Sequence, residues 1–85
     1  MIRHVDLGET AFKRSRQLKI LLDKGEIQLV GNRKLKIFGT LDCSSGKRMK
    51  MDNRVFFKSE AEAKSVCYRP CGHCMRGAYA QWKAQ

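Results

Sequence analysis

The sequence lacks a long hydrophobic segment and a secretory signal. No apolar run in its 85 residues approaches the roughly 18 residues that a membrane span requires. The first four residues, MIRH, lead into no signal-peptide core. We therefore expect a cytoplasmic protein with no membrane partner, in a reducing compartment where a cysteine cluster binds metal more often than it forms disulfides.

Acidic residues are also scarce. Eight Asp and Glu stand against eighteen Lys and Arg, so the formal net charge is +10. A charge of this size attracts polyanions such as nucleic acid. Residues 32–58 alone carry eight basic and two acidic residues. The competing interpretation is a basic surface that serves only solubility, but the size and clustering of the excess favour a polyanion such as nucleic acid as the partner.

The chain is too short for a large core. A domain of this size removes only roughly 60–65% of its unfolded surface from water, so a bound metal or a partner would matter for its stability. The sequence has no internal repeat and no low-complexity linker. We expect a single, monomeric domain over residues 1–85.

The hydrophobic pattern predicts a small α/β domain of the α+β type. We expect a three-stranded, mainly antiparallel sheet flanked by helices, with a cysteine-rich metal knuckle near the C-terminus. The predicted helices are Thr10–Lys24, Ser59–Val66 and Arg76–Lys83, and the predicted strands are Glu26–Val30, Lys34–Phe38 and Arg54–Phe57. Residues 1–8 are expected to form a loose lead-in and residues 40–53 a loop.

Local signals mark several of these boundaries. Thr10 and Ser59 are the expected N-caps, and Gly25 is the expected C-terminal stop. Residues 31–33 (GNR) are predicted to form the turn of a hairpin between the first two strands. In the second strand, Leu35 and Ile37 would face the core, and the lysines and Phe38 would lie on the other face.

Three of the four cysteines lie within eight residues, and Cys71-x-x-Cys74 forms the kernel of this stretch. Two thiolates at this spacing can bind one side of a tetrahedral metal, because the turn between them points both sulfurs inward. Gly72 suits such a turn. With Cys43 as a third ligand, the pattern predicts a Zn²⁺ site.

The fourth ligand stays open between Cys67, His73, Asp42 and His4. Cys67 lies about one helical turn before Cys71 and could join the site, or it could be a small apolar side chain at a helix end. His73 lies inside the knuckle, where a side chain usually points away from the metal. His4 has no supporting context.

Two other uses of the cysteines are weaker. A redox dithiol of the thioredoxin type sits at a strand-to-helix junction, whereas Cys71 and Cys74 follow a predicted helix. A metal-free form with a disulfide between Cys43 and Cys67 is a further alternative.

Three short runs resemble a known family. They are residues 53–57 (NRVFF), 59–61 (SEA) and 68–74 (YRPCGHC). Together they resemble the zinc-binding N-terminal domain of the Ada-type DNA repair proteins, in which an aromatic-ending strand and a short Ala-rich helix precede an aromatic-Arg-Pro-Cys-x-x-Cys motif. The resemblance covers about residues 10 to 75, and its downstream motif is the specific part.

The resemblance implies a cofactor, a partner and an activity. Ada-type domains hold zinc with four cysteines, and one of these thiolates removes the methyl group from a DNA methylphosphotriester in a single stoichiometric transfer. Zinc keeps the sulfur deprotonated and nucleophilic, and a basic surface holds the anionic backbone around the neutral lesion. A role in DNA alkylation repair and transcription regulation follows as an expectation.

This sequence departs from the family at the first ligand pair, which is C-x-x-x-C with the earlier cysteine as methyl acceptor. In one register Cys43 is the second, structural ligand, and Gly39 stands at the acceptor position. In the other register Cys43 is the acceptor, and Lys47 occupies the missing ligand position. The number of residues between Cys43 and the run that begins at Asn53 favours the first register. Cys67 stands where the family tends to have the glycine that ends the helix.

We therefore expect an Ada-like, zinc-binding module that contacts the DNA phosphate backbone and lacks the methyl acceptor. The expected phosphate contacts are Lys47, Arg48, Lys50, Arg54 and Arg69, with Lys34 and Lys36. One alternative is an active protein that takes a methyl group onto Cys43 as its catalytic residue. Another is a structural or protein-interaction domain without catalysis.

Overall fold

The computed structural model describes residues 1–42 and 49–84 as an α+β domain built on a five-stranded mixed sheet. The strands lie in the order β1-β4-β2-β3-β5. Their bounds are β1 Ile2–Arg3, β2 Leu29–Asn32, β3 Ile37–Thr40, β4 Arg54–Phe57 and β5 Arg69–Pro70. The helices are α1 Ala11–Asp23, α3 Glu60–Ser65 and α4 Arg76–Ala84, with short 3-10 turns η1 His4–Leu7 and η2 Met51–Asn53.

The predicted fold class is confirmed, but the sheet has two strands more than predicted. β1 pairs antiparallel with β4, so residues 1–8 are not the loose lead-in that we expected. β5 pairs in parallel with β3, with Ile37 opposite Arg69 and Phe38 opposite Pro70. Each of these strands has only two residues, which is too short for an alternating pattern to mark it.

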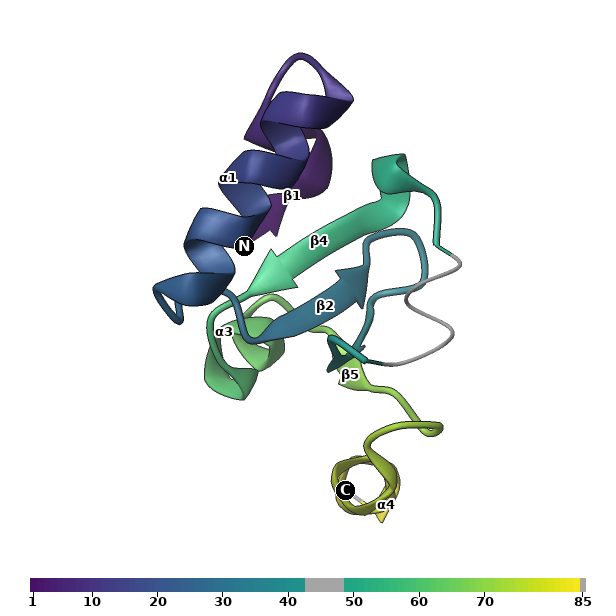
Figure 1. Ribbon diagram of the computed structural model, residues 1–85. Coiled ribbons are helices and arrows are strands. Elements are labelled where there is room, and N and C mark those ends of the chain that lie inside the picture. The colour runs from purple at the N-terminus through teal and green to yellow at the C-terminus, as the bar shows by residue number, and fades with distance from the viewer. Residues whose placement is uncertain (43–48, 85) are drawn as a thin grey trace.

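Two hydrophobic clusters cover the two faces of the sheet. Val30 and Phe56 pack with Leu18 and Leu21 of α1 on one face. Val55 and Phe57, the neighbours of Phe56 in β4, pack on the other face. Their cluster contains Phe38, Val55, Phe57, Ala63 of α3 and Tyr68. This alternation along β4 follows from the two-residue period of a strand, and Figure 1 shows α1 and α3 on opposite sides of the sheet.

The expected caps of α1 are confirmed. The Thr10 side chain accepts a hydrogen bond from the Lys13 N–H at 3.2 Å. At the other end Gly25 adopts a φ of +71°, and the Gly25 and Glu26 N–H groups donate to the Leu22 and Leu21 carbonyls. This is the Schellman arrangement, in which glycine takes the left-handed position without steric cost.

The predicted hairpin is present, but its turn lies about two residues later than expected. Asn32 closes the turn by accepting the N–H groups of Lys34 and Leu35 on its side-chain oxygen. Gly31 is not part of the turn because it lies in β2, where a Cβ atom would come within 2.8 Å of the Phe57 ring.

The later turn also changes the faces of the second strand. Leu35 lies in the turn and is 62% exposed, whereas Phe38 is fully buried. The expectation that Leu35 faces the core and Phe38 lies on the charged face was therefore wrong. The bare backbone of Gly31, which pairs with Phe38, leaves the room that the large rings on this face need.

The C-terminal part of the domain begins with α3. Ser59 caps α3 through the Glu62 N–H at 3.2 Å, as predicted, and the Glu62 carboxylate accepts from the Lys58 N–H. α4 lies beyond β5, away from the rest of the sheet (Figure 1). None of the helices in the described ranges 1–42 and 49–84 is long and apolar enough to cross a membrane.

Candidate metal centre

Cys71 and Cys74 lie at the edge of the sheet, directly after β5. The Cys71 N–H donates to the Phe38 carbonyl at 2.7 Å, which continues the β3–β5 pairing by one residue. Both sulfurs accept backbone hydrogen bonds: Cys71 Sγ from the His73 N–H at 3.4 Å and Cys74 Sγ from the Thr40 N–H at 3.3 Å. The backbone thus fixes the positions of both sulfurs, and the thiolate form of such a cysteine is the form that binds a metal.

Gly39 in β3 faces both cysteines. A Cβ atom built on Gly39 would lie 2.6 Å from Cys74 Sγ and 3.2 Å from Cys71 Cβ. The space in front of Gly39 is therefore the place where the two cysteines meet β3, and a side chain at position 39 would enter it directly. This arrangement fits the register in which Gly39 stands at the family's acceptor position.

The donor set fits a thiolate-binding metal such as zinc. Cys71 and Cys74 supply two sulfurs at C-x-x-C spacing. Cys43, the predicted third ligand and alternative catalytic residue, lies outside the described residues, as do Lys47 and Arg48. Within the described ranges, no three His, Cys, Asp or Glu side chains form a group that could hold a metal. The site thus depends on a ligand beyond these two cysteines.

Cys67 does not join Cys71 and Cys74 in such a group. It is exposed, and it follows α3 with a φ of +67°. This left-handed conformation is one that glycine adopts readily and other residues avoid. The structure therefore gives a physical reason for the glycine that the family tends to have here, and it places the Cys67 thiol in solvent.

The remaining candidate ligands form no group of three with the cysteines within the described ranges. His73 and Asp42 are exposed. His4 packs its ring edge-on against Phe56, with the ring centres 5.5 Å apart. Burial, with the charges of Arg54 and Arg14, lowers the pKa of His4 below its ordinary value.

The predicted phosphate contacts gather at one end of the sheet. The β2–β3 turn carries Arg33, Lys34 and Lys36. The strand pairing sets Arg54 beside Asn32 and Arg69 beside Ile37, so an arginine flanks the turn on each side. We call Arg33, Lys34, Lys36, Arg54 and Arg69 the basic end. Lys50, also predicted, is exposed and lies just before η2, which bonds to the turn through the Arg33 N–H and the Asn53 carbonyl.

Sequence reasoning missed the contact between Arg69 and α4. The Arg69 guanidinium carbon lies 5.6 Å from the ring centres of both Tyr79 and Trp82. The two rings are 5.8 Å apart and tilted by 31°. The i, i+3 spacing of the two aromatics on a helix predicts that they share a face, but nothing in the sequence shows that Arg69 lies against them.

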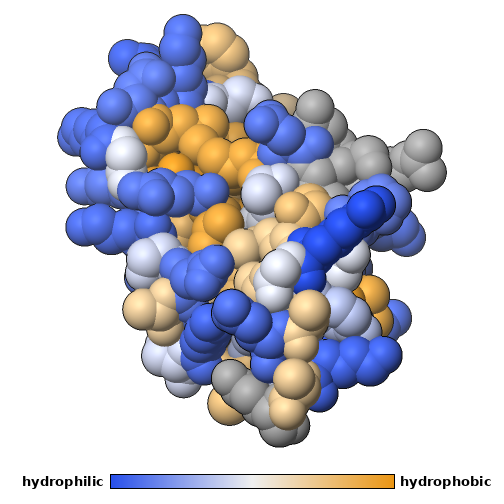
Figure 2. All heavy atoms as spheres, turned by 90° about the horizontal axis from the view of Figure 1, so that it is seen from below, coloured by the Kyte–Doolittle hydropathy of each residue, from blue (hydrophilic) through white to orange (hydrophobic). Residues whose placement is uncertain are grey.

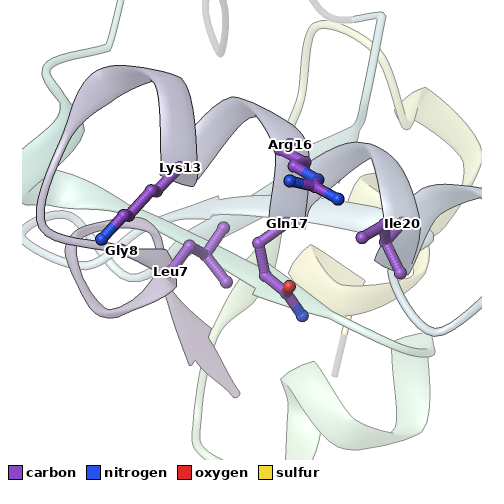
Figure 3. Close-up of a pocket in the computed structure, with 6 residues that line it drawn as sticks. All are labelled: Leu7, Gly8, Lys13, Arg16, Gln17 and Ile20. Atoms are coloured by element: carbon purple, nitrogen blue, oxygen red, sulfur yellow. The ribbon is translucent and has the colours of Figure 1, made fainter.

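A separate shallow pocket of about 390 Å³ lies along α1. Its lining residues are Leu7, Gly8, Lys13, Arg16, Gln17 and Ile20 (Figure 3). None of the cysteines or of the residues of the basic end contributes to it. This pocket is therefore not part of the candidate metal centre.

A mixed sheet with a C-x-x-C knuckle at its edge defines a small cysteine-based metal-binding domain. The family model described as the metal binding domain of Ada matches residues 26–76, a segment that contains β2 to β5, α3, Cys71 and Cys74. The chain belongs to this family, as the sequence motifs predicted. No curated protein and no solved structure matches the chain.

We predict that Gly39→Ala weakens metal binding. The added methyl group would lie 2.6 Å from Cys74 Sγ, and forcing atoms apart in a packed site costs about 1–3 kcal/mol. We expect the zinc affinity, measured by competition with a chromogenic chelator, to fall by about tenfold or more. Gly77→Ala is the control, because a Cβ atom there meets nothing within 4 Å. Wild-type affinity in the Gly39 variant would contradict the placement of the site.

We predict that Cys67→Gly stabilises the domain. Glycine relieves the left-handed strain at this position, so the free energy of unfolding in urea should rise by about 1 kcal/mol. Cys67→Ala removes the thiol but keeps the strain, so it should not stabilise. Both variants should bind as much zinc as the wild type. A loss of zinc in both would instead identify Cys67 as a ligand.

Proposed function

We propose that this domain is a zinc-stabilised DNA-binding module in which Cys71 and Cys74, with Cys43, hold the metal. The basic end then contacts the phosphate backbone. Zinc, when bound, links the segment after β3 to the segment after β5 and compensates the negative charge of the thiolates. Membership of a metal-binding family supports the metal, and the structure supports the contact surface.

The observation that carries DNA binding is the position of the basic end. The β2–β3 turn contributes three of its five cationic residues, and β4 and β5 contribute one arginine each. The pairing of Asn32 with Arg54 and of Ile37 with Arg69 places these arginines beside the turn. Clustered cationic side chains repel one another, and an anionic partner offsets this repulsion when it binds. A row of Lys and Arg on a small surface suits phosphates, which carry no sequence information.

The neighbouring surface agrees with this role. Residues 63–85 contain four Lys and Arg and no Asp or Glu. Seen from the side on which α4 lies, hydrophilic side chains border an apolar area and cover much of the rest of the surface (Figure 2). The positive potential of the basic end is therefore not cancelled by acidic side chains from the C-terminal segment.

A salt titration tests the proposal. The affinity for a fluorescently labelled duplex, measured by anisotropy between low and physiological salt, should fall steeply as salt rises. The slope of log K against log salt should drop by about 2 in the double variant Lys34→Gln/Lys36→Gln, because each lost phosphate contact removes about one unit. Lys13→Gln/Lys19→Gln is the control: it removes the same charge from α1.

The two outcomes are distinct. An equal loss in both double variants would mean that only the total charge matters and that the basic end is not the contact surface. No binding at low salt would exclude a nucleic-acid function and leave the structural or protein-interaction role.

Methyl transfer onto Cys43 is the second candidate, and the position of Gly39 argues against it. We expect Cys43 to remain unmodified after incubation of the zinc-loaded protein with methylphosphotriester DNA. In the active alternative, the thiolate would take the methyl carbon, a C–S bond would form, and the C–O bond would break to leave a phosphodiester. Peptide mass spectrometry would then show a gain of about 14 Da on Cys43, one CH₂, and that gain would establish the alternative.

A further inference from the structure

Trp82 and Tyr79 form an aromatic surface at the end of the domain that carries Arg69. Trp82 is 43% exposed, and the Tyr79 ring also packs on Gly72 of the knuckle, at 3.4 Å from where a Cβ atom would stand. Arg69 lies at 5.6 Å from both ring centres. The backbone around Gly72 thus supports one ring, while the second, larger ring stays accessible.

Two features argue that this surface serves binding as well as packing. A half-exposed Trp on a helix that contacts mainly β5 contributes less to the core than a buried ring would. The rings also hold the Arg69 guanidinium by cation–π contact, and the backbone N–H of Arg69 bonds to the Lys36 carbonyl at 2.9 Å. The aromatic surface is therefore joined directly to the turn of the basic end.

We propose that Trp82 is a stacking site for an unpaired nucleobase, while Arg69 and the β2–β3 turn hold the adjoining phosphates. Aromatic side chains next to a positive surface are the usual means by which proteins bind single-stranded nucleic acid, because every base has a flat face. In a duplex the base faces are covered by their neighbours, so Trp82 can engage only an unpaired or unstacked base. This inference rests on the proposed DNA-binding function.

The site depends on a segment outside the family match. The matched residues end at 76, and both aromatic rings belong to α4, which runs from Arg76 to Ala84. The stacking site is thus an addition to the metal-binding domain, and it would confer a preference for single strands that the basic end alone does not supply.

Trp82 reports on its own contacts because it is the one tryptophan in the sequence. We expect a thymine oligonucleotide of about 20 nucleotides to quench its fluorescence on binding, since stacking on a base quenches an indole ring. Inorganic polyphosphate carries the same kind of charge without bases and should bind without quenching. A duplex of matched length should bind with little quenching.

The matched variants separate stacking from charge. Trp82→Ala should weaken single-strand binding about 5- to 100-fold by anisotropy of labelled oligonucleotide, with the affinities for duplex and polyphosphate within about twofold of wild type. Trp82→Phe keeps a ring and should recover most of the loss. If Trp82→Ala does not fold, the quenching experiment on the wild type still decides the matter.

Failure of this inference differs from failure of the proposed function. Saturating single-strand binding without a change in Trp82 fluorescence, or an equal loss of duplex and single-strand affinity in Trp82→Ala, would overturn the stacking site and leave DNA binding intact. Absence of binding to every oligonucleotide would overturn both.

Discussion

The parallel pairing of β3 with β5 is the contact on which both proposed sites depend. Its backbone hydrogen bonds run from the Arg69 N–H to the Lys36 carbonyl and from the Cys71 N–H to the Phe38 carbonyl. One end of this short pairing places Arg69 beside the β2–β3 turn, and the other end places Cys71 and Cys74 against Gly39. A metal at the cysteines would lie next to the last hydrogen bond of the pair, so binding there would stabilise the same contact that positions Arg69.

The core explains why so short a strand stays in place. Pro70 has no N–H to donate, but it is fully buried next to Phe38, and Tyr68 packs edge-on against Phe57 with ring centres 4.9 Å apart. Burial of these side chains supplies the free energy that two residues of backbone pairing cannot. The edge of the sheet is thus held by side-chain packing as well as by backbone pairing.

Local chemistry made much of the fold predictable from the sequence. Thr10, Gly25 and Ser59 marked helix ends because caps and left-handed glycines act within a few residues. The hairpin turn was misplaced because Gly31, a turn former by type, is required by the distant Phe57 ring instead. The same limit applies to the site: the C-x-x-C spacing predicted the knuckle, whereas the contacts of Gly39 with Cys74 and of Arg69 with α4 join segments far apart in the chain, which no local pattern encodes.

The count of four cysteines equals the number of ligands in the family that the sequence resembles, but the positions differ. Gly39 faces the knuckle where a ligand is expected, and Cys67 has the backbone conformation of a helix-ending glycine. Cys67 is exposed and has a left-handed backbone conformation that is strained for cysteine. Position 39, in contrast, has no room for a Cβ atom beside the Cys74 sulfur. A thiol at position 67 therefore does not replace one at 39. The proposed metal and phosphate contacts use Cys43, the knuckle and the basic end, none of which requires a thiol at position 39.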